Sequence, residues 1–338
     1  MTFPPASDLL SAVDAEMRQI LEAVAVDVSG FATMLRYPLG WMTAEGGPYN
    51  EPTGKRVRPI LLLMCAEAAG GDVRKALSAA AAVELLHNFS LIHDDIQDDS
   101  PLRHGRDTVW RVWGVANAIN AGDAMFTLSF AAMQRLAKTG SSAEITLRAL
   151  ELFTETALTL TRGQHLDMRF EHEKNVSVGQ YIDMISGKTA ALLGLCAQLG
   201  ALIASCDDER AAHFGRFGVD LGIAFQIHDD ILGIWGDEAK TGKSAASDIL
   251  SRKKSLPVLY GLERSARLSE IYAQPSDAEI DVAEVVGLLN EVGALKYARD
   301  LEQDYSAKSA AALAAANPEP KAAAALRALI DALFDRRS

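Results

Sequence analysis

The pentapeptide Ile-His-Asp-Asp-Ile occurs twice in this chain, at Ile92–Ile96 and at Ile227–Ile231. Each copy places two adjacent carboxylates inside an otherwise apolar stretch. A buried carboxylate is costly unless a cation or a hydrogen-bond donor meets it. Two such pairs therefore predict two acidic surfaces that share one cationic cargo, and a divalent metal ion carrying a polyanion is the natural candidate.

The first acidic cluster is the more complete of the two. It contains Asp94, Asp95, Asp98 and Asp99. On a helix Asp94 and Asp98 share a face, where two like charges repel each other unless a cation lies between them. Mg²⁺ takes oxygen ligands and shares phosphate oxygens with a substrate. The alternative is a solvated acidic helix end, which the helix dipole disfavours at a C-terminus.

The second cluster has Asp229 and Asp230 but lacks an acid one turn further on, where Gly233 stands. Asp237 lies seven residues after Asp230 and returns to the same face only if the helix continues past Gly236. If the helix ends there, Asp237 is a turn residue.

Basic residues accompany both clusters. Gly54–Pro59 (GKRVRP) places three cations at the start of a helix, where the dipole and arginine forks favour phosphate. Further basic segments are 103–106, 188–189, 241–243 and 252–254. A metal–diphosphate complex needs both signs of charge close together, although each segment alone is equally typical of a solvated turn. His87 lies two helical turns before Asp94 on nearly the same face, as a ligand of the diphosphate or as a core histidine.

The elements that must position these residues are helices, because strong helix formers dominate and alternating β-branched runs are scarce. We predict an all-α, single-domain bundle of roughly ten or more helices over residues 1–338. The expected helices begin at Ser7-Asp8, reaching the early thirties, and after Pro59, and continue at 73–99, 115–138, 142–168, 178–204, 208–236, 255–265, 278–292, 294–315 and 320–335. Residues 43–54 and 100–108 are expected to be loops.

Bulk properties exclude several classes. A net charge of −12 argues against unspecific binding to nucleic acid. The N-terminus lacks the pattern of a signal peptide, and three sparse cysteines, expected in the core, fit a reducing cytoplasm. The uncharged stretch Thr189–Ser205 approaches membrane-spanning length, but a buried central helix explains a single such segment better than membrane insertion does.

Six motifs in order resemble those of the trans-isoprenyl diphosphate synthases, the polyprenyl synthetase family. They are GKRVRP, LLHNFSLIHDDIQDDSPLRHG, GQHLD, GKTA, FQIHDD and KKSLP, between Gly54 and Pro257. The resemblance implies helices around a deep central cavity, usually in a homodimer. It also implies that roughly three Mg²⁺ ions, with Mn²⁺ as the alternative, join an allylic diphosphate to both acidic clusters.

The same resemblance implies a role for each matching residue. Metal ligands or their support would be Asp94, Asp95, Asp98, Asp229 and Asp230. Isopentenyl diphosphate would be bound by Lys55, Arg58, His87 and His104. The allylic diphosphate would be bound by Arg103, Lys188, Lys243 and Lys253. The reacting centre would include Gln164, Asp167, Lys188, Gln226 and Asp229.

Two departures from the family pattern stand out. Many members have an arginine where His104 stands, and a histidine there is charged only part of the time. Many also carry an acid at the position of Gly233, and Asp237 is a conjectural substitute. Neither departure removes a metal-binding role from Asp229.

Product length is expected to depend on Phe89, five residues or about 7.5 Å along the helix before Asp94, with the small Ser90 beside it. In the family, an aromatic residue at this position shortens the product. The combination resembles synthases of the C20 geranylgeranyl product, with C15 farnesyl second. A class I terpene cyclase is the first rival, but it needs no site for isopentenyl diphosphate. A non-catalytic subunit of a heteromeric synthase is the second, although such a subunit should have lost acids from a cluster.

Overall fold

The computed structural model confirms the predicted all-α class. It describes residues 4–24, 28, 30–49, 54, 56–173, 175–236, 247–275 and 278–334. Within these ranges, the only strands are a two-residue pair, Leu102–Arg103 (β1) and Arg106–Asp107 (β2). The predicted site residues Lys55 and Lys243, and the conjectural Asp237, lie outside the described residues.

The chain forms two compact units. Unit 1 contains Met1–Thr154 and Cys196–Ala211, and unit 2 contains Glu155–Leu195 and Ala212–Ser338. The boundaries fall within three helices, α7 (Ala143–His172), α9 (Ala191–Ser205) and α10 (Asp208–Trp235). The single domain and the deep central cavity expected from the sequence stay predictions.

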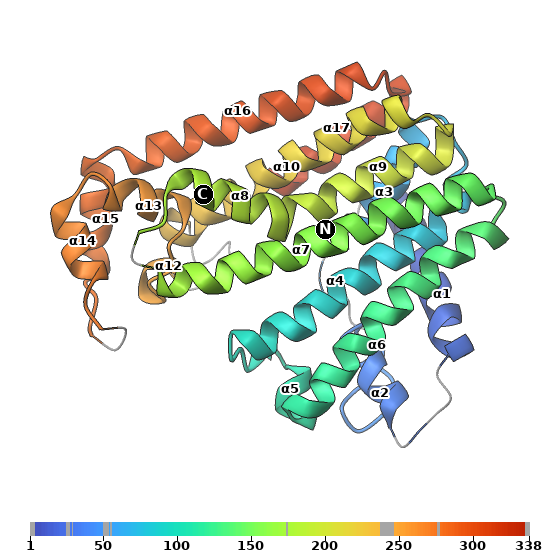
Figure 1. Ribbon diagram of the computed structural model, residues 1–338, viewed down its shortest axis with the longest axis horizontal. Helices are drawn as coiled ribbons and strands as arrows, with labels where there is room; N and C mark the ends of the chain where they lie inside the picture. Colours follow the sequence, from blue (N-terminus) through green and yellow to red (C-terminus); the bar gives the residue numbers. More distant parts are fainter. Residues whose placement is uncertain are drawn as a thin grey trace. The chain divides into compact units, whose positions relative to one another are not determined.

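Unit 1 carries the first acidic cluster on its central helix. The helices that lie wholly in this unit are α1 (Pro4–Val24), α2 (Phe31–Arg36), α3 (Val57–Ala68), α4 (Leu77–Gln97), α5 (Val109–Trp113) and α6 (Val115–Gln134). Helices α4 and α6 run side by side in Figure 1. The His93 ring fills the place of a side chain at Gly122, so this glycine allows α4 and α6 to pack closely.

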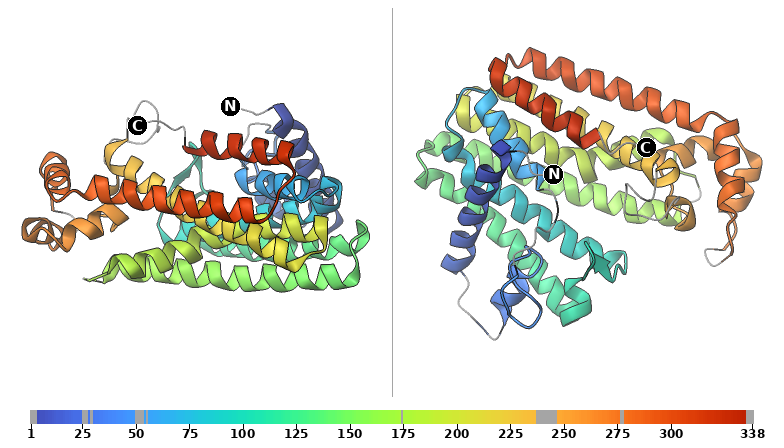
Figure 2. Two further views of the ribbon diagram at one scale, coloured as in Figure 1. Left: turned by 90° about the horizontal axis from the view of Figure 1, so that it is seen from above. Right: turned by 180° about the vertical axis from the view of Figure 1, so that it is seen from behind.

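Unit 2 carries the second acidic cluster on α10. Its other helices are α8 (Val178–Ile185), α12 (Ser247–Leu250), α13 (Leu256–Leu262), α14 (Ala266–Tyr272), α15 (Val282–Glu291), α16 (Ala294–Ala315) and α17 (Pro320–Phe334). Ser177 and Gln180 form a capping box that begins α8. Figure 2 shows α17 folding back along α16. The Ser309 hydroxyl of α16 donates to the Phe217 carbonyl of α10 over 3.0 Å.

Most predicted helices are confirmed, with specific corrections. The first helix does not reach the early thirties, because α1 ends at Val24 and a separate helix begins after Gly30, whose φ is 84°. The predicted helix 73–99 begins with a 3₁₀ turn over Val73–Ala76 (η1), and 135–138 is likewise a 3₁₀ turn. The short helices α5 and α14 escaped prediction because neither is long enough to show a period.

Two further expectations concern burial. Cys65 and Cys196 are buried as predicted, whereas Cys206 is exposed and has a φ of 53° at the end of α9. Among the described residues, Val178–Ser205 is the one stretch long and apolar enough to cross a membrane. Because 72% of its apolar window is buried within the protein, a core helix explains the composition.

Candidate active site

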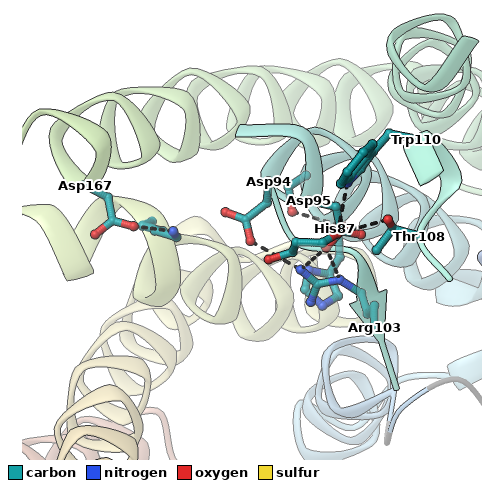
Figure 3. Close-up of polar contacts among 10 residues, drawn as sticks. His87, Asp94, Asp95, Arg103, Thr108, Trp110 and Asp167 are labelled. Atoms are coloured by element: carbon teal, nitrogen blue, oxygen red, sulfur yellow. Dashed lines mark hydrogen bonds and ion pairs between the residues drawn. The ribbon is translucent and has the colours of Figure 1, made fainter. Parts of the chain in front are cut away.

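The first acidic cluster is built around Arg103. Its Nε donates to Asp95 Oδ1 over 2.8 Å, and its Nη2 lies 3.4 Å from Asp94 Oδ2 (Figure 3). Asp95 is only 5% exposed, and burial raises the pKa of its carboxyl while Arg103 opposes the shift. Asp94 stays partly exposed, and Asp98 ends α4 with its N–H bonded to the Asp94 carbonyl. Asp95 therefore anchors Arg103, while Asp94 and Asp98 remain accessible to a ligand.

A β-hairpin holds Arg103 in this position. Its two turn residues, His104 and Gly105, both have positive φ, at 52° and 76°, as a type I′ turn requires. The Thr108 hydroxyl and the Trp110 indole both donate to the Ser100 carbonyl, over 3.0 and 2.9 Å (Figure 3). The basic loop expected over 100–108 is thus a defined hairpin tied back to the end of α4.

Next to this hairpin, Arg58 and His87 form a half-buried hydrogen-bonded pair. Arg58 Nη1 lies 3.1 Å from His87 Nε2. Burial lowers the pKa of His87 well below 6.5, and the neighbouring Arg58, Arg103 and His104 lower it further. The neutral imidazole can therefore accept a hydrogen bond from Arg58. His104 is also an electrostatic neighbour of His87, and its Nε2 would lie 3.6 Å from a Cβ built on Gly54. Three predicted ligands of one diphosphate, Arg58, His87 and His104, are therefore neighbours.

A buried acid backs this pair. Glu84 is 5% exposed, and burial raises the pKa of its carboxyl against the opposing effect of Arg56 and Arg58. Asn88 donates to Glu84 Oε1 over 3.2 Å. Among the described residues, neither Glu84 Oε2 nor Arg58 Nε has a hydrogen-bond partner. Glu84 was missed by sequence reasoning because a single acid in a helix of alanines and leucines has no motif.

The three cations of GKRVRP thus have different surroundings. Arg56 adopts the left-handed region with a φ of 45° at the start of α3. Its guanidinium pairs with Asp14 and donates to the Leu39 carbonyl over 3.2 Å. Arg56 therefore ties α3 to α1 and to the segment before it, while Arg58 turns towards His87.

In unit 2, Asp230 is anchored much as Asp95 is. It is 1% exposed and accepts hydrogen bonds from the Tyr181 hydroxyl, from Gln226 Nε2 over 3.2 Å and from the Leu256 N–H over 3.1 Å. Burial raises the pKa of the Asp230 carboxyl, opposed by Lys253, the Tyr181 hydroxyl and the Leu256 N–H. Protein donors already surround Asp230, whereas Asp229 beside it is partly exposed.

Two glycines bring a second ion pair into place. A Cβ at Gly163 of α7 would overlap the backbone of Gly187 and Lys188, so these segments touch directly. Lys188 lies in a π-helical turn, Ser186–Ala190 (η3), of the kind that is frequent at functional sites. Its Nζ pairs with Asp167, as drawn in Figure 3. Gln164 lies one turn before Asp167, on the same face of α7.

The remaining predicted residues of unit 2 join this group. The Thr189 hydroxyl donates to Gln226 Oε1 over 3.0 Å. Burial lowers the pKa of Lys253, but the carboxylates of Asp230, Asp248 and Asp167 outweigh burial and raise it overall. Its neighbour Lys254 instead donates to the Phe170 carbonyl over 2.8 Å at the end of α7. Lys253 therefore lies beside the second acidic cluster, whereas Lys254 lies beside Glu171 and Glu173.

The predicted chain-length residue begins a row of aromatic rings in unit 1. Ring centroids are 4.9 Å apart between Phe89 and Phe126, and 5.1 Å apart from Phe126 to Phe130 and from Phe130 to Phe153. Phe89 also meets the His93 ring edge-on, at 4.9 Å. The Ser90 hydroxyl bonds to the His87 carbonyl over 2.7 Å.

The donor set of both clusters suits a hard cation. Among the described residues, no three histidine, cysteine, aspartate or glutamate side chains lie close enough to hold a metal ion by themselves. Mg²⁺ commonly takes only one or two carboxylates and completes its shell with water and phosphate oxygens. In each cluster taken by itself, the accessible carboxylates, Asp94 and Asp98 in unit 1 and Asp229 in unit 2, are of the kind that suits Mg²⁺.

Comparison with known proteins places the chain first in a class, the all-α prenyltransferases. A polyprenyl synthetase from Streptomyces coelicolor A3(2), a solved structure, aligns with a TM-score of 0.89 at 34% identity, covering 97% of this chain and 98% of that one. The predicted fold class and prenyltransferase activity are thereby confirmed.

The chain belongs to the polyprenyl synthetase family, whose model matches residues 42–289. It is 43% identical over 250 residues to a geranylgeranyl diphosphate synthase of Mycobacterium tuberculosis, covering 72% of this chain and 70% of that protein. It is 42% identical over 227 residues to a (2E,6E)-farnesyl diphosphate synthase of Mycobacterium bovis, covering 67% of this chain and 62% of that protein. The resemblance to short-chain trans-isoprenyl diphosphate synthases is confirmed, and the chain is a prenyl diphosphate synthase.

Proposed function

We propose that the protein condenses isopentenyl diphosphate with an allylic diphosphate, head to tail, and that its main product is geranylgeranyl diphosphate. In each round the allylic C–O bond breaks, a carbon–carbon bond forms to the double bond of isopentenyl diphosphate, and one proton leaves. The departing diphosphate itself can take this proton, so the reaction requires no side-chain base.

The observation that carries this proposal is that one buried donor atom of Arg58 has no hydrogen-bond partner among the described residues. The residue itself is half-buried, and the atom is its Nε. A buried donor without an acceptor is costly, and an incoming anion that accepts a hydrogen bond from it removes that cost. Because His87 and His104 lie beside it, the site is suited to a diphosphate. A terpene cyclase, which takes no isopentenyl diphosphate, gives this pair no purpose.

Under this proposal the aspartates of the two clusters have two different functions. Asp94, Asp98 and Asp229 would hold Mg²⁺, or Mn²⁺, when the allylic diphosphate is bound. Asp95 and Asp230 are buried and hold neighbouring donors in place. Bound Mg²⁺ neutralises charge that develops on the diphosphate as it departs.

Four cations complete the allylic site in this proposal. Arg103, Lys188 and Lys253 lie among the acids and bind diphosphate oxygens, with Lys243 as the expected fourth. The paired acids fix the positions of these cations before substrate arrives, so little reorganisation is needed as the allylic bond breaks. Asp167 pairs with Lys188 and Gln226 bonds to the adjacent Thr189, so with Gln164 they would line the reacting centre in this proposal.

The relatives and the aromatic row bear on product length. Relatives carry both geranylgeranyl and farnesyl names, so C15 farnesyl diphosphate is the second candidate. We favour the C20 product because Phe89 lies about 7.5 Å before Asp94 and the rings behind it are rigid neighbours. The tail would grow along α4 until it meets these rings.

The proposal extends to assembly and location. Val115 and Ile119 on α6 are 48% and 43% exposed, which is high for large apolar side chains on one helix. Their exposure supports a homodimer, in which a second copy would cover them. A cytoplasmic location would supply the reducing conditions that suit its free cysteines.

One assay tests the proposal. Purified protein is incubated with Mg²⁺, isopentenyl diphosphate and dimethylallyl, geranyl or farnesyl diphosphate, and the dephosphorylated products are separated by chromatography. We expect geranylgeraniol from each starter and no product with EDTA. Cyclic hydrocarbon formed without isopentenyl diphosphate would identify a cyclase. Turnover only after addition of a partner protein would identify a subunit.

A further inference from the structure

The glycine that interrupts the second acidic cluster is covered by an acid from elsewhere in the chain. A Cβ built on Gly233 would lie 2.5 Å from Asp248 Oδ2 and 2.6 Å from Asp248 Cγ. These distances are shorter than side-chain atoms tolerate, so the carboxylate occupies the place that a residue-233 side chain would take. Gly233 follows Asp229 by four residues in α10 and therefore lies on the same face, one turn further along.

The position of Asp248 is fixed by its neighbours in α12. The next residue, Ile249, is fully buried in a core cluster with Ile234 and Val258. The Asp248 carbonyl accepts a hydrogen bond from the Lys253 N–H over 2.8 Å. Ile234 directly follows Gly233, so the same core cluster secures both sides of the contact.

The charge of Asp248 acts on the same group of residues. Its carboxylate and those of Asp230 and Asp167 are anionic neighbours of Lys253. A carboxylate at Gly233 thus adds negative charge beside Asp229 and attracts a lysine of the proposed allylic site. Sequence reasoning missed it because Asp248 lies fifteen residues beyond Gly233, a separation with no helical meaning.

We propose that Asp248 is the missing acid of the second cluster, and that the lack of a side chain at Gly233 is what admits it. It is a positioning residue: it supplies charge and hydrogen-bond acceptors beside Asp229 and holds Lys253. The inference rests on the proposed function for its metal-binding role but not for the contact itself. It also implies that an aspartate at residue 233, the family's frequent choice, impairs this protein.

The test is a double-mutant cycle of Asp248→Asn, Gly233→Asp and the two combined. The matched control is Gly287→Asp in α15, where a Cβ would meet no described atom within 4 Å. Two quantities are measured on the full chain: urea unfolding without metal, and the Mg²⁺ concentration for half-maximal pyrophosphate binding by calorimetry.

We expect Gly233→Asp to lower the unfolding midpoint more than Gly287→Asp, through overlap with Asp248 and repulsion between two carboxylates. Asp248→Asn should reduce that difference in the double variant, because asparagine keeps the size of the side chain but removes the repulsion. Asp248→Asn alone should raise the half-maximal Mg²⁺ concentration about tenfold, as loss of groups around metal ligands does. The double variant, whose acid comes from residue 233, should recover at least part of this loss.

Equal midpoints for the two glycine variants, or additive effects in the double variant, would overturn the contact as a functional pair. Unchanged Mg²⁺ dependence in Asp248→Asn would overturn its role near the metal. If the wild-type protein makes no prenyl product yet shows the coupled unfolding midpoints, the proposed function fails and the Gly233–Asp248 pair stands.

Discussion

Replacement of His87 by glutamine should remove a specific pH dependence of stability. His87 lies between Arg58, Arg103 and His104, and its folded-state pKa is well below the unfolded value of 6.5. Between those two pKa values the unfolded chain binds one more proton than the folded chain. The free energy of unfolding therefore falls as the pH falls below 6.5, and it is unaffected by His87 above about pH 7.5.

The size of the change in unfolding free energy follows if His87 stays neutral in the folded protein and titrates only in the unfolded chain. Unfolding at pH 5.5 is then favoured by about 1.4 kcal/mol relative to pH 7.5 through this residue alone. Glutamine does not titrate and can still accept a hydrogen bond from Arg58. The His87→Gln variant should therefore lose less stability on acidification than the wild type, by about that amount.

Urea unfolding of both proteins at pH 7.5, 6.5 and 5.5 measures this difference. Comparison of the two proteins cancels the contributions of Glu84, Asp95 and Asp230, whose raised pKa values act in the opposite direction. His213→Gln, at an exposed Arg216 contact, is the control. Parallel pH profiles for the wild type and His87→Gln would refute the assignment of a neutral, cation-flanked His87.

Three further predictions concern other parts of the molecule. Phe89→Ala should lengthen the product by at least one isoprene unit, read by chromatography, and cost about 1–3 kcal/mol of stability through lost aromatic contacts. Gly163→Ala should cost about 1–3 kcal/mol by overpacking against the Lys188 backbone, and should lower kcat. Glu302→Gln should lower stability by about 1 kcal/mol, because it weakens the 3.0 Å contact with His228 beside Asp229.

Matched controls separate these effects from general damage. Phe89→Leu keeps most of the apolar volume and should retain a product closer to that of the wild type. Gly179→Ala in α8, whose Cβ would lie 3.9 Å from the nearest atom, should fold normally. Unchanged chain length in Phe89→Ala, or full activity in Gly163→Ala, would contradict the respective argument.

Most helices were predictable because their apolar periods are long and their ends carry ordinary signals. The boundaries of α15, α16 and α17 lie within four residues of those expected. Proximity in sequence also revealed both acidic clusters and the cations that follow them. The aspartate–arginine pairing at Asp95 was not predictable, because it depends on how a two-residue turn orients Arg103.

Close contacts made at glycines were the features of the structure that the sequence predicted least. At Gly122, Gly163 and Gly233, an atom of another residue occupies the space that a side chain would take. The sequence does not predict which residue supplies that atom. In each case it comes from a different helix, far away in the chain. Such contacts are tertiary consequences of packing, which the period of a single helix does not contain.

The repeated pentapeptide acquires a physical meaning from these contacts. Successive helical residues point about 100° apart, so two adjacent aspartates are not equivalent. In both copies the first aspartate, Asp94 or Asp229, keeps exposed surface, while the second, Asp95 or Asp230, is buried among protein donors. The second aspartate thus holds the surrounding donors, and the proposed role in ligand binding falls to the first.

The histidine of each copy serves packing in the same way. His93 fills the space over Gly122 of α6, and His228 pairs with Glu302 of α16. The preceding isoleucines, Ile92 and Ile227, are 2% and 0% exposed. Each pentapeptide therefore combines an apolar anchor, a histidine contact to a neighbouring helix and a buried acid, and together these leave one carboxylate accessible. Two copies of this local solution explain why the same five residues recur on helices that otherwise differ in sequence.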